Sequence, residues 1–365
     1  MNSQLNIGIL GTRGIPNRYG GFEQCAEYLA LGLTTKGHNV WVYSAHDHEY
    51  KGNKWKGVHI IHCYDPEHKM GTFGQFIYDY NCIKDARKRK FDILLQLGYT
   101  SNSIWYKIWP RDCRNIVNMD GLEWKRSKYN KYVQRFLKYA EKLAALNADI
   151  LVADSIGVKE YLKSTYQKEA AFIPYGADIF DSPDQSVISK YGLKPLSYHL
   201  VVARMEPENN IEMIIKGVIN ARKEKPLIII GKTENNYGSE LTEKYKNNKE
   251  IKFLGGIYES SIVNNLRYFS SLYFHGHTVG GTNPSLLEAM GCRALIVAND
   301  NIFNKSVLGA DAYYFQDQQQ IAEIISENYD KNQQLDKISN NIYKINTLYN
   351  WSHIIDEYEK IFKQL

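Results

Sequence analysis

The chain has 365 residues, a length that favours two domains, each large enough to bury a core of its own. Its 44% hydrophobic and 23% charged residues are typical of a globular protein, and a formal net charge of +5 is too small to indicate nucleic-acid binding by itself. There is no apolar run of about 18 residues to span a membrane, and the five cysteines are scattered without a CxxC pair, which argues against a disulfide framework or a zinc site and fits a reducing cytoplasm.

The first residues, MNSQLNIGIL, lack the basic region and cleavage site of a signal peptide. Short apolar runs then alternate with amphipathic stretches along the first half of the chain. We expect strands at residues 5–11, 39–45, 58–64, 92–98, 115–121, 149–155 and 170–176. The clearest helices are expected at residues 21–37 and 132–148. Uninterrupted apolar strands separated by helices predict a parallel sheet covered on both faces.

A stretch at residues 175–197, which carries prolines and aspartates, is the expected linker, and the alternation restarts after it. Further strands are expected at residues 198–204, 226–231, 251–256, 271–277 and 293–299. We therefore predict an α/β protein with two doubly wound Rossmann-like domains that face each other across a cleft, with ligands bound beyond the carboxyl ends of the strands. The predicted domains are residues 1–175 and 176–345, and residues 346–365 form a helix expected to pack back on the body.

The first strand leads into a glycine-rich loop, GTRGIPNRYGGFE, which raises the question of a dinucleotide site. Gly8, Gly11 and Gly14 have the spacing G-x-x-G-x-x-G rather than G-x-G-x-x-G, and the second strand ends at Ala45 rather than at an acid that would hold a ribose. These departures disfavour a nicotinamide cofactor. An anion site made by backbone N–H groups, with Arg13 as a cation, and a tight turn without a ligand both remain open.

A second glycine-rich loop, in FHGHTVGGTNPSLLEAMG, carries a more specific signal. Pro284 stands where a first helical turn favours proline, and Glu288 follows one turn later. N–H groups at such a helix start can hold phosphates, and a carboxylate one turn on can accept ribose hydroxyls, which together describe a nucleoside diphosphate site. An ordinary strand-to-helix turn remains the alternative. The candidate phosphate-binding residues are Gly280, Gly281, Thr282 and Asn283.

Arg204 stands just past a strand in VVARMEPENN, where a guanidinium can neutralise a diphosphate leaving group. His275 and His277 flank a glycine at another strand end, but no third ligand stands at metal spacing and the sequence has no D-x-D motif. We therefore expect neither a metal nor a cofactor.

Three motifs, GTRGIPNRYGGFE, MDGLEWKR and HTVGGTNPSLLEAMG, resemble in their order those of retaining glycosyltransferases of family 4, which have the two-domain GT-B fold. The resemblance covers essentially the whole chain. It is strongest to the rhamnosyltransferase-type branch that builds bacterial capsule, O-antigen and cell-wall polysaccharides. It implies that Gly20 and Gly21 lie under the donor phosphates, that Glu288 binds the donor ribose and that Arg204 holds the diphosphate.

The chain departs from that family at two positions. The family usually has an acid eight residues before the ribose-binding one, where this chain has Gly280, and a lysine five residues after the arginine, where this chain has Asn209. We expect the N–H groups of Gly280, Gly281 and Thr282 to make the missing contacts, with Arg13 as a second cation.

The stretch NMDGLEWKR is the expected acceptor side. Asp120 follows a strand where the family often has a histidine near the donor sugar, so it is a candidate catalytic residue beside Arg204; a turn-forming Asp-Gly pair is the alternative. Glu123, Trp124 and Arg126 are candidate acceptor contacts, but a helix start and a core tryptophan would place the same residues there.

The resemblance thus implies transfer of L-rhamnose from dTDP-rhamnose, with retention, to a hydroxyl of a lipid-linked saccharide. A GT-B protein that only binds sugar nucleotides or acts as a scaffold, and a nicotinamide-dependent oxidoreductase, are the alternatives. Basic residues cluster at 87–90 and 125–131, which fits either solvated helix faces or peripheral contact with the cytoplasmic face of the membrane. The expected location is cytoplasmic.

Overall fold

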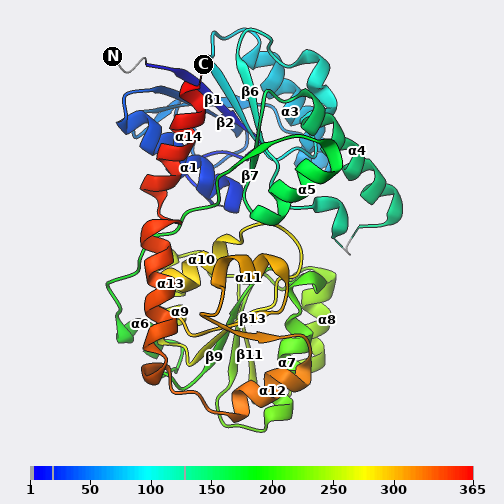
Figure 1. Ribbon diagram of the computed structural model, residues 1–365. Coiled ribbons are helices and arrows are strands. Elements are labelled where there is room, and N and C mark those ends of the chain that lie inside the picture. The colour runs from blue at the N-terminus through cyan, green and yellow to red at the C-terminus, as the bar shows by residue number, and fades with distance from the viewer. Residues whose placement is uncertain (1–3, 19, 127–128, 365) are drawn as a thin grey trace. The chain divides into compact units, whose positions relative to one another are not determined.

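The computed structural model describes residues 4–18, 20–126 and 129–364, and Figure 1 shows its elements. The chain divides into two compact units. The N-terminal unit groups Met1–Lys125, Tyr129–Tyr175 and Trp351–Leu365, and the C-terminal unit groups Arg126–Lys128 and Gly176–Asn350. Each unit is built on a parallel sheet with helices on both faces, so the predicted doubly wound α/β class is confirmed.

The N-terminal unit has an eight-stranded sheet in the order β3-β4-β2-β1-β5-β6-β7-β8, parallel except for the β3–β4 pair. Its strands are β1 Asn6–Leu10, β2 Asn39–Ala45, β3 Lys54–Trp55, β4 Val58–Cys63, β5 Ile93–Leu97, β6 Arg114–Asn118, β7 Ile150–Ala153 and β8 Ala170–Phe172. Its helices are α1 Gly21–Thr35, α2 Glu67–Met70, α3 Phe73–Ala86, α4 Lys131–Asn147, α5 Ile156–Tyr166 and α14 Trp351–Lys363, with 3-10 turns η1 Ser103–Ile108 and η2 Glu123–Lys125. In Figure 1, α1 and α14 lie on one side of this sheet and α3, α4 and α5 on the other.

The last helix, α14, belongs to the core of the N-terminal unit although it is the end of the described chain. Trp351 stacks on Tyr28 of α1 with 4.3 Å between ring centroids. The fully buried Tyr358 accepts a 3.0 Å hydrogen bond from the side-chain amide of Asn118, at the end of β6.

The C-terminal unit has a six-stranded, wholly parallel sheet in the order β11-β10-β9-β12-β13-β14. Its strands are β9 His199–Val202, β10 Leu227–Ile230, β11 Ile251–Gly255, β12 Leu272–His275, β13 Ile296–Asn299 and β14 Tyr313–Phe315. Its helices are α6 Gln185–Ser189, α7 Ile211–Ala221, α8 Asn236–Tyr245, α9 Ser260–Phe269, α10 Pro284–Gly291, α11 Ile302–Leu308, α12 Gln318–Ser326 and α13 Leu335–Thr347, with η3 Pro207–Asn209 and η4 Lys331–Gln333. The chain reverses its direction across the sheet between β9 and β12, and ligands of open α/β sheets bind at such a switch point, outside the carboxyl ends of the strands.

Within the described part of the chain, no helix has the length and apolar content needed to cross a membrane.

Candidate active site

The loops that follow β9 and β12 interlock at the switch point of the C-terminal unit. A Cβ atom on Gly276 would collide with the carbonyl oxygen of Asn209, so only glycine allows this close approach. The side-chain amide of Asn210 donates to the carbonyl oxygen of Gly276 at 2.9 Å. Thr278 donates to the carbonyl oxygen of Glu208 from both its backbone N–H, at 3.1 Å, and its hydroxyl, at 2.9 Å. The two loops are therefore held as one platform at the carboxyl edge of the sheet.

Helix α10 begins at this platform. Pro284 occupies its first position and the Asn283 side chain caps it, accepting a hydrogen bond from Ser285 N at 2.9 Å. Gly280 has φ +130°, a conformation that L side chains rarely adopt. The four predicted phosphate-binding residues, Gly280 to Asn283, thus form the turn that leads directly into a helix N-terminus, where anions are favoured.

Arg204 lies two residues beyond β9 with its side chain exposed at the same edge. Asn209, in the place of the family's lysine, turns inward: its amide nitrogen donates to the Arg204 carbonyl oxygen at 2.8 Å, and its Oδ1 lies 2.8 Å from Nδ1 of His277. Burial, with the charges of Arg126 and Arg204, lowers the pKa of His277 to about 3, so this ring is uncharged at neutral pH. The sequence places His277 near the loop, but its pairing with Asn209 depends on contacts between loops that spacing does not reveal.

Glu288 lies one turn into α10, with 30% of its side chain exposed. Its carboxylate forms a 2.7 Å ion pair with Arg267 of α9, whose side chain is only 3% exposed. Arg267 also donates to the Ser285 hydroxyl at 3.0 Å. Arg267 is not among the site residues predicted from the sequence. The signal for it is its position next to Leu266 on the buried stripe of α9, where a charged side chain needs a partner.

In the N-terminal unit, Gly20 is the N-cap of α1, which begins at Gly21. The preceding loop is tied to its own unit. Arg13 donates from its backbone N–H to the Glu23 carboxylate at 2.9 Å. Its guanidinium donates to the Glu67 carboxylate from Nε, at 3.0 Å, and from Nη2, at 2.7 Å. The charge of Arg13 is therefore compensated by an acid on α2, a pairing that the sequence did not predict.

Asp120 lies at the carboxyl end of β6, on the loop edge of the sheet, and has the left-handed backbone conformation, φ 47°. Its N–H donates to Asn118 Oδ1 at 2.9 Å, and its Oδ1 accepts from the Tyr175 hydroxyl at 3.4 Å. The backbone is thus that of an Asp-Gly turn, and its carboxylate is held at the edge where ligands of such sheets bind.

Trp124 and Glu123 are both part of η2. The Trp124 indole N–H donates to Glu141 at 2.9 Å, and this fully buried carboxylate on α4 also accepts from Tyr161 and Tyr166. The indole N–H of the half-buried Trp124 is thus hydrogen-bonded to a carboxylate within its own unit. The Glu123 N–H donates to the Tyr99 hydroxyl at 3.3 Å.

Arg126, which is grouped with the C-terminal unit, has Nη1 3.8 Å from Oε1 of the buried Glu208. Of the basic residues in the 125–131 cluster, Lys128 lies outside the described residues.

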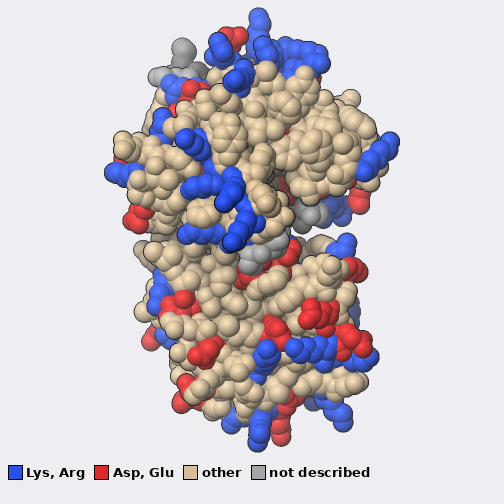
Figure 2. Space-filling model, turned by 90° about the vertical axis from the view of Figure 1, so that its right-hand side faces the viewer, with Lys and Arg blue, Asp and Glu red and all other residues tan. Residues whose placement is uncertain are grey.

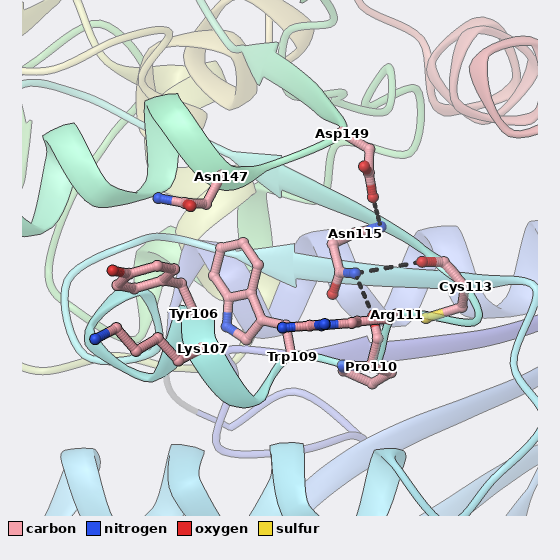
Figure 3. Close-up of a pocket in the computed structure, with 9 residues that line it drawn as sticks. All are labelled: Tyr106, Lys107, Trp109, Pro110, Arg111, Cys113, Asn115, Asn147 and Asp149. Carbon is pink, nitrogen blue, oxygen red and sulfur yellow. Dashed lines mark hydrogen bonds between the residues drawn. The ribbon is translucent and has the colours of Figure 1, made fainter.

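A cavity of about 330 Å³ opens elsewhere in the N-terminal unit, and Figure 3 shows the residues around it. It is lined by Tyr106, Lys107, Trp109, Pro110, Arg111, Cys113, Asn115, Asn147 and Asp149. Cys113 and Asp149 come immediately before β6 and β7, so this cavity lies at the amino ends of the strands. That is the opposite edge of the sheet from Asp120, and none of the predicted site residues line it.

The two halves of the chain match two different protein families. Residues 189–345 match the family described as "Glycosyl transferases group 1", and residues 4–178 match a "Domain of unknown function (DUF1972)". The match to the glycosyltransferase family lies within the C-terminal unit. Its matched range contains the β9–β12 platform, Arg204 and Glu288. A comparison with curated protein sequences finds no match.

Solved structures share the architecture of the whole chain. Sucrose-phosphate synthase from Thermosynechococcus elongatus superposes with a TM-score of 0.81 at 15% identity, covering 99% of both chains. HepE from Anabaena, solved with UDP and glucose, superposes with a TM-score of 0.77 at 16% identity over 100% of both chains. The apo structure of OtsA gives 0.71 at 10% identity, again over 100% of both. At these identities the likeness shows the fold alone, and it confirms the predicted two-domain GT-B fold of the chain.

Proposed function

We propose that this protein is a retaining glycosyltransferase that uses a nucleoside diphosphate sugar as its donor, and that this donor is dTDP-rhamnose. The observation that carries the proposal is the switch-point platform of the glycosyltransferase domain, where an exposed arginine, a glycine turn with a helix N-terminus and a carboxylate one turn along meet at one sheet edge. HepE, which has the same fold, was solved with UDP and with UDP-glucose.

In this proposal Glu288 accepts the ribose hydroxyls, and Arg267 holds its carboxylate in place. The N–H groups of Gly280, Gly281 and Thr282 and the Arg204 guanidinium hold the diphosphate. Arg204 also neutralises the charge that develops on the departing diphosphate, which makes it catalytic. Gly20 and Gly21, at the positively polarised start of α1, and Arg13, in the loop before this helix, are the donor contacts proposed for the N-terminal unit.

The acceptor side is proposed for the segment from Asp120 to Arg126. Asp120 orients the attacking hydroxyl, with Glu123, Trp124 and Arg126 contacting the acceptor saccharide. With no enzymic nucleophile assigned, attack on the same face that the phosphate leaves, assisted by that phosphate, accounts for retention. Catalysis then consists mainly of positioning and of charge neutralisation.

A lipid-linked acceptor would require contact with the cytoplasmic face of the membrane, and α4 supports this part of the proposal. Tyr132, Phe136 and Tyr139 are exposed along it, at 80%, 37% and 56%. Lys131 and Arg135 are exposed on the same stretch of the helix, while Glu141, the acid within α4, is buried. Figure 2 shows Lys and Arg side chains gathered on the face of the N-terminal unit that carries α4. By contrast, Trp105 and Trp109 of the nearby WYKIW stretch donate their indole N–H groups to Phe76 O and Asn102 O, so they are structural.

The first test is a thermal-shift panel with dTDP, UDP, GDP, NAD and NADP. A ligand at 100 times its dissociation constant adds about 2.7 kcal/mol of stability. We expect dTDP to give the largest shift. A preference for UDP or GDP would keep the glycosyltransferase and change the donor, whereas a response only to NAD or NADP would contradict the proposal.

A GT-B protein that binds sugar nucleotides without transferring them is the alternative, favoured by Gly280 and Asn209 in the places of the family's acid and lysine. Release of nucleoside diphosphate from the preferred sugar nucleotide, measured with and without a saccharide acceptor, distinguishes the two. Binding without any turnover would support the alternative.

A further inference from the structure

The interlocked loops of the glycosyltransferase domain fix the protonation of one histidine. The carbonyl oxygen of Arg204 can only accept a hydrogen bond, so the Asn209 side-chain atom 2.8 Å from it is the amide nitrogen. The other side-chain atom, Oδ1, then faces Nδ1 of His277 at 2.8 Å. Because Oδ1 accepts, Nδ1 of the ring carries a proton. Nε2 is therefore the nitrogen that changes when this ring gains or loses its charge.

Nε2 points toward the phosphate loop. A Cβ atom built on Gly280 would lie 3.0 Å from it, so the ring occupies the space beside the residue that replaces the family's acid. The backbone of His277 is fixed by the start of α11, since its carbonyl oxygen accepts from the side-chain amides of Asn301, at 2.9 Å, and Asn304, at 3.1 Å. The ring is thus held in place before any ligand arrives.

Several ionisable groups face this ring. Burial lowers its pKa first, and the positive charges of Arg126 and Arg204 lower it further, while a hydrogen bond with the Val279 backbone acts in the opposite direction. The His275 ring lies 6.0 Å away and is likewise uncharged at neutral pH, because burial lowers its pKa to about 3. The buried Glu208 carboxylate lies 3.8 Å from Arg126. The backbone carbonyl oxygen of Glu208 accepts a hydrogen bond from Thr278, the residue after His277. A diphosphate beside Arg204 would reverse the sign of the local charge and favour the charged ring.

We propose that His277 is the second cation of the donor site: on donor binding Nε2 takes a proton from the solvent and donates it in a hydrogen bond to a phosphate oxygen. The proton returns to solvent when the nucleotide leaves. Asn209 thereby supplies, through the ring that it holds, the charge that a lysine at position 209 would have supplied. This inference rests on the proposed function, because it requires a diphosphate on the platform.

The test is calorimetric titration of the protein at pH 7.5 with UDP-glucose and dTDP-glucose, whose phosphates do not themselves titrate near this pH. Repeating each titration in buffers of different ionisation enthalpy gives the number of protons taken up per nucleotide bound. We expect measurable proton uptake by the wild type and almost none by His277→Gln, whose amide can still donate but cannot be charged. The variant's affinity should fall about tenfold at pH 6.5 and less at pH 8.5. His59→Gln, on β4 of the other unit, is the matched control and should keep the uptake.

A spectroscopic measurement covers the case in which His277→Gln is unstable. In the ¹⁵N-labelled wild type, His277 should show a proton on Nδ1 alone without ligand and on both nitrogens with the sugar nucleotide. Nucleotide binding with no proton uptake, or with uptake unchanged in His277→Gln, would overturn this inference and leave the proposed function intact. Failure of every sugar nucleotide to bind would instead remove the proposed function, and this inference with it.

Discussion

The two arginines that we propose to serve the donor site differ in what surrounds them. Arg204 is exposed, whereas Arg267 is 3% exposed and its charge is balanced by Glu288. An exposed charge contributes little to folding, but a buried charge that loses its partner is costly. Substitutions at these two residues therefore separate a role in turnover from a role in stability.

Arg204→Ala should reduce turnover by about 100-fold or more, as expected when a charged donor to the transition state is removed, and should leave the melting temperature unchanged. Steady-state kinetics and thermal unfolding measure the two effects. Arg87→Ala, another exposed arginine, should change neither. Unchanged turnover in Arg204→Ala would rule out the role proposed for this residue.

Glu288→Gln should destabilise the protein by about 3 kcal/mol, since it leaves the Arg267 charge buried without its partner. Arg267→Met should cost less, because the partly exposed Glu288 remains hydrated. In the double variant the buried charge is gone, so stability should rise above that of Glu288→Gln while nucleotide affinity stays low. Urea unfolding of the wild type, the two single variants and the double variant gives the coupling energy between Glu288 and Arg267. If the two single losses of stability add up in the double variant, the ion pair does not act as a unit.

The proposed donor residues can be placed at one edge of the sheet from the sequence alone, because strand ends, glycines and a helix start are sufficient to locate them. Arg204, the Gly280–Asn283 turn and Glu288 follow from that pattern. The partners of these groups do not follow from it. Arg267 comes from the neighbouring helix, Glu67 is 54 residues from Arg13, and Asn209 reaches His277 across two loops. Such pairs are fixed by packing between elements, which a single sequence does not encode in its spacing.

Among the elements, helices α1 and α14 pack closely against each other. Gly32 lies on α1 where a Cβ atom would collide with the side chain of Ile355 on α14. The glycine costs helix propensity and allows the two helices to approach.

Gly32→Leu should therefore destabilise the N-terminal unit by about 1–2 kcal/mol, because overpacking outweighs a propensity gain of about 0.8 kcal/mol. Denaturant unfolding measures the change. Thr35→Leu, on the exposed end of α1, is the control and should stay within about 0.5 kcal/mol of the wild type. Adding Ile355→Ala to Gly32→Leu should recover part of the loss, and equal stability of the two leucine variants would contradict the packing argument.

Helix α3 carries a buried acid, Asp79, which accepts a hydrogen bond from Ser101 after β5. Burial raises its pKa to about 7, with the hydrogen bond acting against this rise. An unfolded aspartate titrates near 3.9, so between about pH 4 and pH 7 the folded state binds more protons than the unfolded state, and stability falls as pH rises.

Asp79→Asn should flatten this profile and make the protein more stable than the wild type at pH 8, by up to about 4 kcal/mol. Urea unfolding from pH 4 to pH 8 provides the test. Asp112→Asn, at an exposed position, should follow the wild-type profile. A profile for Asp79→Asn as steep as that of the wild type would show that Asp79 is not the group responsible.

The strands that sequence predicts well are the long apolar ones, and those it misses are short. β14 has three residues between two helices, and β3 has two on a sheet edge. Segments of this length give too few residues for a periodicity, and only pairing with a neighbouring strand defines them.

For the molecule as a whole, sequence sufficed for the fold class because two sets of buried parallel strands leave few alternative architectures. The proposed contact with a membrane is a separate matter, and it is assigned to α4. Near an anionic surface each basic residue contributes about 1 kcal/mol.

Lys131→Glu together with Arg135→Glu should therefore weaken binding to vesicles containing phosphatidylglycerol by at least tenfold, as measured by co-sedimentation. Wild-type binding should fall with added salt and be absent on phosphatidylcholine. Lys190→Glu with Lys223→Glu, both exposed on the C-terminal unit, makes the same charge change elsewhere and should bind like the wild type. Equal binding by the two double variants would exclude α4 as the contact surface.

The position of α14 has a consequence for how this protein is made. The N-terminal unit takes its strands from the first 175 residues but closes its core with Trp351–Lys363. During synthesis, every residue of the C-terminal unit is made before α14, so the earlier unit lacks one of its helices until then. The first unit to be translated is thus the last to be finished. In the interval its α1 surface, with Tyr28 and Gly32, is uncovered and accessible to chaperones.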